Sequence, residues 1–463
     1  MTLTKVLFVA FILSLTACGS PSDSENKETN LPHTITDKSE ENTGNQETNV
    51  ETVTQQTNNQ QPDVTTPQTN APINSGSTVY DYLNQLRESA GLIPLKENNL
   101  LAQASNNHAN YLISNDSFGH DESIQLTGFT GVSAADRVNS TNYFSRTVGE
   151  GISTGKTDNH AIDNLFSAIY HRFTLMSPVY NEIGIASSQE VNGNSLILVH
   201  NMANSGLNQL CQQAPFSGFG TFYENVCKNE VSLEAAAYDQ ALTSTRIGND
   251  SIIVWPPVNG KDIPPAFFEE TPDPLSDYGV SGYPVSIVFN GHDTDEFLLE
   301  NIYLYNDNTN QLVTDTRLLN QDTDPNQSFS TNQHALFPLQ RLDWNTRYRV
   351  EISYRVNNTL SSKTWTFQTR EPATKTIKLA EDQSSFSLEI GVKTALYIPP
   401  QNPFDTLSAI KVSSPQNVNV ALDFFDQNTL LIYATGTSNA TINITLDDGI
   451  DAIPRVLTAE INV

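Results

Sequence analysis

Basic residues are scarce in this sequence. Its 463 residues include 24 lysines and arginines against 52 aspartates and glutamates, which gives a formal net charge of −28. Such a charge repels phosphate backbones and anionic membrane surfaces, so we predict no nucleic-acid partner. A long apolar run is also missing near the N-terminus, where Val6–Leu13 falls far short of the roughly 20 residues that a membrane-spanning helix needs.

The N-terminus has the layout of an export signal. Lys5 precedes the apolar run and small residues precede Cys18, so residues 1–17 are predicted to be a signal peptide. Leu15-Thr16-Ala17-Cys18 resembles the bacterial lipobox, which implies acylation of Cys18 and anchoring to a membrane through that lipid. The same resemblance implies that Gly19, directly after the cysteine, permits sorting to the outer membrane. We expect a cell-envelope lipoprotein facing the periplasm or the exterior; the alternative is an ordinary cleavage site beside a chance cysteine.

Cysteine is scarce as well, with three residues in the chain. The two that follow Cys18 are an even pair in an exported protein, which favours a disulfide between Cys211 and Cys227 over a redox or metal role. Between Cys18 and residue 77 the sequence is rich in Ser, Thr, Asn, Gln, Glu and Pro. Residues 18–77 are therefore predicted to be the acylated cysteine followed by a disordered linker.

The remainder separates into an α/β part and a β-rich part. Apolar residues at helical spacing predict helices from near Val79, from near Asn99 and from Asn159 to Phe173, and strand patterns follow them. A proline-dense tract from Trp255 to Pro274 introduces short alternating runs that are typical of β-sandwiches. The predicted domains are an α/β domain at 78–205, a disulfide-containing connector at 206–254, and two β-sandwiches at 255–371 and 372–463.

Four segments of the α/β part are similar to the CAP superfamily, which includes cysteine-rich secretory proteins, venom antigens and plant pathogenesis-related proteins. They are Leu83-Asn84-Gln85-Leu86-Arg87 with Gly91–Leu95, Phe118-Gly119-His120, Asp136-Arg137-Val138 with Val148-Gly149-Glu150-Gly151, and Tyr170-His171-Arg172 with Tyr180–Ile185. The resemblance implies an α/β/α sandwich (the CAP, or SCP, fold) for residues 78–205. Runs at 263–268, 282–285 and 335–367 resemble Ig-like modules that follow CAP domains in bacterial exported proteins.

The resemblance also implies a polar cleft formed by His120, Glu150, His171 and Glu182. Imidazole nitrogens and carboxylate oxygens at converging positions suit Zn²⁺ or another divalent cation, and an acidic protein concentrates cations. Each residue also has a structural interpretation: His120 closing a loop, Glu150 bracing backbone donors, His171 ending a helix, and Glu182 lying on the surface. His108 is interpreted as a core histidine. Gly151, Leu165 and Tyr170 depart from the family pattern, which has Asn, Trp and Gly there.

These features predict an extracellular binding module that captures a small ligand, a lipid, a cell-surface ligand or a divalent metal in the CAP cleft. Two alternatives remain, a metal-dependent extracellular hydrolase or protease and an adhesin that uses the β modules. The sequence contains no HExxH motif, and no catalytic residue is proposed. Catalysis is therefore the less favoured hypothesis.

Overall fold

The computed structural model describes residues 48–54, 78–189, 195–292, 294–400, 402, 406–407, 409–447 and 455–462. The predicted signal peptide and Cys18 lie outside these residues. The chain divides into two compact units. The described part of the first is residues 78–372 with residue 402, and that of the second is strand β1 (Thr48–Thr54) with the other described residues from 373 onward. Among the described residues, no helix combines the length and the apolar character needed to cross a membrane.

The first unit begins with helices that start at capping residues. Thr78 and Asp81 form a capping box at α1, Asn98 caps α2, and Ser133 with Asp136 forms a second capping box at α3. These side chains accept hydrogen bonds from backbone N–H groups that the first helical turn leaves unpaired. The helices of this part are α1 (Val79–Ser89), α2 (Asn99–Ser114), α3 (Ala134–Ser140), α4 (Asp158–Ser167) and α5 (Ile169–Leu175).

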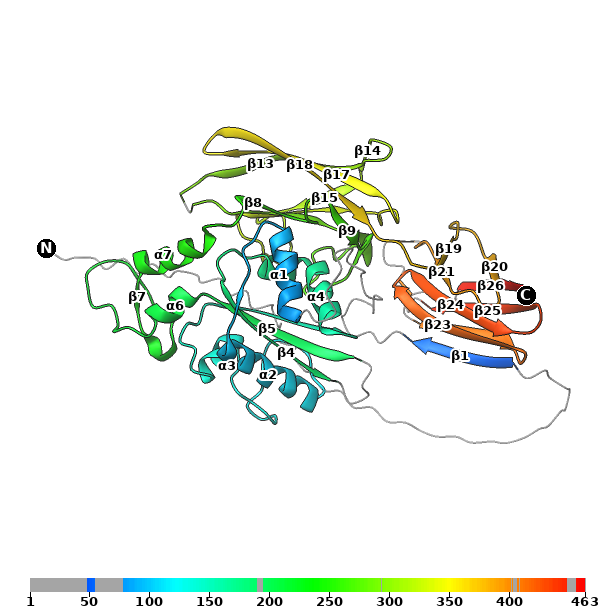
Figure 1. The fold of residues 1–463 in the computed structure, drawn as a ribbon, viewed down its shortest axis with the longest axis horizontal. Helices are drawn as coiled ribbons and strands as arrows, with labels where there is room; N and C mark the ends of the chain where they lie inside the picture. The colour runs from blue at the N-terminus through cyan, green and yellow to red at the C-terminus, as the bar shows by residue number, and fades with distance from the viewer. Residues whose placement is uncertain are drawn as a thin grey trace, which may run out of the picture. The chain divides into compact units, whose positions relative to one another are not determined.

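These helices cover a four-stranded sheet in the order β2 (Lys96–Glu97), β4 (Glu182–Gln189), β5 (Leu196–Ala203) and β3 (Val148–Gly155). Helix α2 contacts β4 and β5, whereas α4 and α5 contact β3, and Figure 1 shows α2 and α3 on the opposite side of β4 and β5 from α1 and α4. Close packing of α2 requires a glycine at 184, because a Cβ atom there would lie 1.9 Å from the backbone nitrogen of Ala102. The predicted arrangement of helices on both faces of a sheet is present in this region.

The predicted helix from Asn159 to Phe173 is two helices. The break falls at Ala168, whose backbone is extended, with φ −73° and ψ 121°. The carboxylate of Glu270 accepts hydrogen bonds from the backbone nitrogens of Ile169, at 2.7 Å, and Tyr170, at 3.3 Å. The side chain of a distant residue thus serves as the cap of α5, because Ala168 itself provides none.

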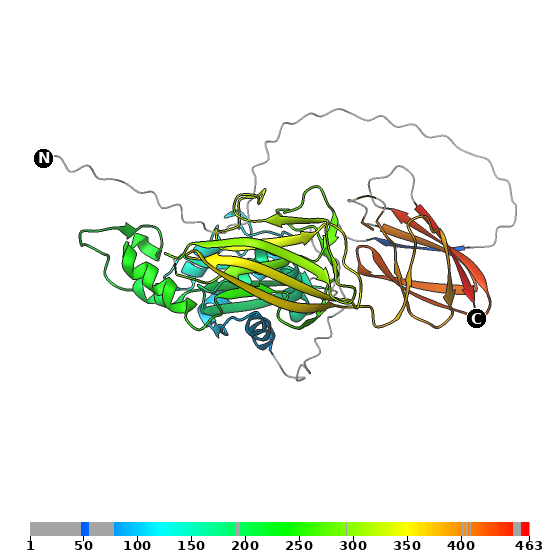
Figure 2. The same ribbon diagram turned by 90° about the horizontal axis from the view of Figure 1, so that it is seen from above.

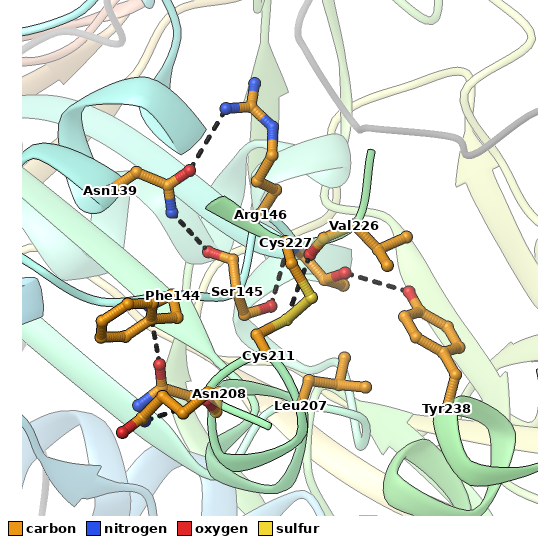
Figure 3. The surroundings of a disulfide bond; sticks show 12 residues. Asn139, Phe144, Ser145, Arg146, Leu207, Asn208, Cys211, Val226, Cys227 and Tyr238 are labelled. Carbon is orange, nitrogen blue, oxygen red and sulfur yellow. Dashed lines mark hydrogen bonds between the residues drawn. A yellow bond between two sulfur atoms is a disulfide. The ribbon is translucent and has the colours of Figure 1, made fainter. Parts of the chain in front are cut away.

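A small lobe follows the sheet, and Figure 2 shows its green helices at one end of this unit. The disulfide joins Cys211 to Cys227, with 5.4 Å between the Cα atoms, as the sequence predicts. Figure 3 shows contacts that join the disulfide region to the segment between α3 and β3: the backbone nitrogen of Phe144 donates to Asn208, and Ser145 forms a β-bridge with Cys227. The elements are α6 (Ser205–Leu210), β6 (Phe222–Tyr223), η1 (Lys228–Glu230), β7 (Leu233–Glu234) and α7 (Ala235–Arg246).

The rest of the first unit is all β. One sheet has the order β15-β16-β12-β8 and another the order β14-β13-β17-β18-β9, while β10 and β11 pair separately. Buried residues of both sheets belong to the same hydrophobic cluster as those of α1, α4 and α5. The strands are β8 (Ile252–Trp255), β9 (Gly260–Ile263), β10 (Ala266–Phe268), β11 (Val280–Gly282), β12 (Val285–Phe289), β13 (Phe297–Asn306), β14 (Gln311–Leu312), β15 (Thr316–Leu319), β16 (Gln333–Pro338), β17 (Arg347–Val356) and β18 (Thr359–Thr369).

The second unit has a core of its own, formed by two sheets in the orders β1-β22-β25-β26-β20 and β19-β21-β24-β23. Its first strand comes from the segment predicted to be a linker, since β1 pairs antiparallel with β22 over seven residues, Thr48 opposite Pro415 and Thr54 opposite Ala409. The strands are β1 (Thr48–Thr54), β19 (Lys375–Lys378), β20 (Ser385–Glu389), β21 (Thr394–Tyr397), β22 (Ala409–Pro415), β23 (Val418–Asp426), β24 (Thr429–Gly436), β25 (Ala440–Asp447) and β26 (Arg455–Asn462).

Removal of the disulfide should weaken the connector lobe selectively. The two cysteines are 16 residues apart and both are buried in a small core with Leu207 and Tyr238. A loop of that length is worth about 3 kcal/mol of chain entropy. We expect Cys211→Ala/Cys227→Ala to lower the opening free energy of α6 and α7 by about that amount, measured by amide hydrogen exchange. Unchanged exchange in the lobe would contradict this, and the second unit serves as the internal control.

Candidate functional site

Three of the predicted cleft residues lie together. His120 follows α2 in the loop toward α3, Glu150 lies on β3 and His171 on α5. The rings of His120 and His171 are nearly parallel, with their centroids 6.3 Å apart and 19° between their planes. Nδ1 of His120 is 2.9 Å from Oε1 of Glu150. The side chains of His120 and His171 are 19% and 17% exposed, so both can be reached from solvent.

The negative charge of Glu150 is balanced by a buried arginine. Nη2 of the fully buried Arg137 donates to both of its oxygens, at 2.7 and 2.8 Å. Burial alone would raise the pKa of Glu150, but the hydrogen bond from His120 and the charge of Arg137 outweigh it and hold this pKa at about 2. Arg137 also donates to the carbonyls of Gly131 and Val132, which fixes its position on α3. Glu150 therefore remains ionised and orients His120.

His200 belongs to the same group, although no motif or spacing in the sequence pointed to it. It lies on β5 opposite Gly151, and a Cβ atom at Gly151 would be 2.2 Å from its Nε2. The imidazole therefore occupies the space that a side chain at position 151 would need. Burial, assisted by the neighbouring His171 and His120, lowers the pKa of His200 to about 3, so the ring is neutral. Neither ring nitrogen has a hydrogen-bond partner among the described residues.

Glu270 is the second residue that sequence reasoning missed. It follows β10 in the all-β region, and its Oε2 is 3.5 Å from Nδ1 of His171 while Oε1 holds the start of α5. Burial raises the pKa of Glu270, although His171 and the backbone donors of α5 oppose the shift. Oε2 of Glu270 and Nδ1 of His171 lack hydrogen-bond partners among the described residues. The one feature of the sequence that could have indicated Glu270 is that it is one of two adjacent acidic residues in the proline-dense tract.

Glu182 is not part of the group. Its side chain accepts a hydrogen bond from the hydroxyl of Tyr143 at 3.0 Å, at the beginning of β4. The described residues contain no group of three or more His, Cys, Asp or Glu placed so that it could hold a metal ion. The predicted four-residue metal set therefore does not fit, because Glu182 lies apart and both oxygens of Glu150 are engaged by Arg137.

His108 lies in the interior, in agreement with its interpretation as a core histidine. Its Nδ1 is 2.9 Å from Oε1 of Glu122 and its Nε2 is 3.0 Å from the carbonyl oxygen of Gly119. Glu122 in turn accepts backbone hydrogen bonds from Thr130 and Gly131 and lies 3.8 Å from Nε of Arg137. This network fixes the loop that carries His120.

Arg137 should be the residue whose loss damages the site most. Arg137→Met leaves the buried carboxylates of Glu150 and Glu122 without their cation, and we expect the free energy of unfolding to fall by about 3–5 kcal/mol. Arg146→Met is the matched control, because its ion pair with Asp136 is about one-third exposed on each side. Pairs of that kind contribute about 1 kcal/mol or less. Urea denaturation followed by circular dichroism measures both values, and equal losses would contradict the assignment.

Comparison with known proteins identifies this region. Residues 80–202 match the family described as "CAP: Cysteine-rich secretory protein family". No curated protein matches the chain. Similar solved structures include an outer surface protein from Borrelia burgdorferi, with 19% identity over 27% of this chain and 87% of the other and a TM-score of 0.23. Another is an extracellular protein containing an SCP domain from Bacillus anthracis. It is 18% identical, the match covers 27% of this chain and 38% of the other, and the TM-score is 0.23.

This chain spans well under half of the Bacillus protein. The family match begins one residue after α1 starts and ends on β5, and it includes His120, Glu150 and His171. It covers the α/β/α region and neither the connector nor the all-β parts. Residues 80–202 are therefore a CAP domain, a member of the cysteine-rich secretory protein family.

Proposed function

We propose that this chain is an exported, lipid-anchored binding protein whose CAP domain takes up a small ligand or a divalent cation between His120 and His171. The observation that carries the proposal is the pairing of each partly exposed imidazole with a buried carboxylate. Nδ1 of His120 is hydrogen-bonded to Glu150, and Nδ1 of His171 lies 3.5 Å from Oε2 of Glu270 without a hydrogen bond. The lipid anchor at Cys18 remains a prediction from the sequence, since Cys18 lies outside the described residues.

A carboxylate behind a histidine fixes which nitrogen faces outward. In His120, a proton on Nδ1 satisfies the carboxylate of Glu150, and the lone pair of Nε2 is then available to a cation or to a ligand's N–H or O–H group. Zinc chemistry suits imidazole, but a structural zinc site requires four protein ligands. Two histidines leave the other positions to solvent or ligand, so we expect reversible uptake and not a permanently bound ion.

Glu150 argues for binding and against hydrolysis. An effective general base has a pKa near the working pH, whereas the pKa of Glu150 is held at about 2 by His120 and Arg137. The other carboxylate, Glu270, is committed to the backbone of α5. Neither carboxylate is therefore suited to act as a general base, and a hydrolase would have to use His120 or His171 in that role. The hydrolase alternative is accordingly the weaker one.

The all-β parts suit a supporting role. We propose that the sheets of residues 252–369 and those of the second unit are Ig-like sandwiches that hold the CAP domain away from the membrane. The aromatic side chains of these sheets are largely buried, including Trp365, Phe367 and Phe337, which favours a structural role over a ligand platform. An adhesin acting through these modules would instead display such residues on its surface.

Titration of the full chain with Zn²⁺ in a calorimeter tests the proposal. We expect one saturable site that disappears in His120→Ala/His171→Ala, because both imidazoles are needed. His292→Ala is the matched control, since this exposed histidine lies in the all-β region and should leave binding unchanged. Zinc binding of equal strength in the double variant, or none in the parent chain, would contradict a cation site at the pair.

A further inference from the structure

The loop closed by the disulfide of Figure 3 carries exposed aromatic rings. Phe216, Phe219 and Phe222 all lie between Cys211 and Cys227 in the sequence. Phe219 is fully exposed and Phe222 is 46% exposed. The rings of Phe216 and Phe222 are neighbours, with their centroids 6.5 Å apart. Single exposed apolar residues are normal on a protein surface, but several gathered in one segment mark a site of interaction.

The segment that carries these rings is uncharged. Residues 212–223 contain no Asp, Glu, Lys or Arg, although charged residues make up 16% of the whole chain. The exposed residues Glu224, Glu230 and Glu234 follow it directly. Residues 212–223, named here the aromatic tip, can therefore leave water without the cost of desolvating an ion. The acidic residues that follow it favour a neutral surface over an anionic one.

The aromatic tip is held in place by the lobe. The backbone nitrogen of Phe216 donates to the carbonyl oxygen of Ser232 at 3.0 Å, and that of Ala235 donates to the carbonyl oxygen of Thr221 at 3.0 Å. Strand β6 pairs with β7, and the disulfide closes the loop at its base. Binding through the tip would therefore not have to order a flexible loop, which would otherwise oppose it.

The size of the aromatic tip favours a lipid surface over a protein partner. An aromatic side chain buries about 150–250 Å², so these three rings, two of them partly covered, offer roughly 400 Å². A stable protein interface buries about 800 Å² on each partner. A fluid lipid interface needs no matching surface, and an apolar projection enters it to the depth of its rings.

We propose that the aromatic tip inserts Phe216, Phe219 and Phe222 into the headgroup region of a zwitterionic lipid bilayer. The small apolar area makes this contact weak and reversible. The sandwiches that we propose to hold the CAP domain away from the anchoring membrane leave the tip to meet a facing bilayer. The contact does not depend on the histidine pair.

Flotation with phosphatidylcholine vesicles tests the contact. The chain from Gly19 to Val463 retains every described residue and lacks the predicted lipid, so the anchor cannot cause binding. We expect saturable binding that is about tenfold weaker in Phe219→Ser, because one exposed ring is lost. Ile124→Ser is the matched control: Ile124 is 71% exposed in the loop between α2 and α3, and its loss should change nothing.

Two further comparisons separate this contact from other causes of binding. Anionic lipid added to the vesicles should weaken binding, because the chain has a net charge of −28. His120→Ala/His171→Ala should bind vesicles as the parent chain does, so a failure of the cation site and a failure of the aromatic tip are distinguishable.

A tryptophan placed in the aromatic tip reports the insertion directly. The three native tryptophans are buried, so Phe219→Trp adds the one exposed indole of the chain. With vesicles, we expect its emission to shift to shorter wavelength and to be quenched by lipids brominated in the acyl chains, whereas Ile124→Trp should not respond. Absence of flotation, unweakened binding by Phe219→Ser with native circular dichroism, or an unshifted emission from Phe219→Trp would overturn the proposal.

Discussion

The packing of α4 and α5 against the all-β region is the interaction on which the rest of this unit depends. Arg172 of α5 is fully buried, and a buried guanidinium is tolerated only where acceptors surround it. Its partners come from both regions: the carbonyl of Phe166, which is on α4, and the carbonyl of Pro284 and the hydroxyl of Ser286 from the β side. Its guanidinium also lies 4.7 Å from the ring centre of Tyr283. The CAP domain and the β region therefore share one core.

This shared core shapes the histidine pair and a cavity of the same unit. Glu270 comes from the β region, yet it caps α5 and stands behind His171, so half of the histidine pair is oriented by residues outside the CAP domain. The cavity between α1, α4, β8 and β9 likewise has walls from both regions. Functional sites frequently lie where two structural regions meet, because neither region alone has to fill the space between them.

The sequence was informative wherever the signal was local. Apolar spacing predicted the helices, and family motifs found His120, Glu150 and His171, which do lie together. Contacts between distant residues were not predictable: Glu270 is about 100 positions from the helix that it caps, and nothing near Ala168 indicates a break. His200 had no signal because its role depends on the space at Gly151 across the sheet. Strand β1 has a sequence typical of a linker, and its partner β22 is more than 350 residues away.

Amide hydrogen exchange of the full chain, compared with Arg172→Met, is the most direct test of the shared core. In the parent chain, α4 and α5 should open with the same free energy as β8 and β12, because they belong to one cooperative unit. The substitution removes the cation that both regions coordinate, so protection should fall on both sides together. Faster exchange confined to α5, with β8 and β12 unchanged, would contradict the account and make the CAP domain an independent unit.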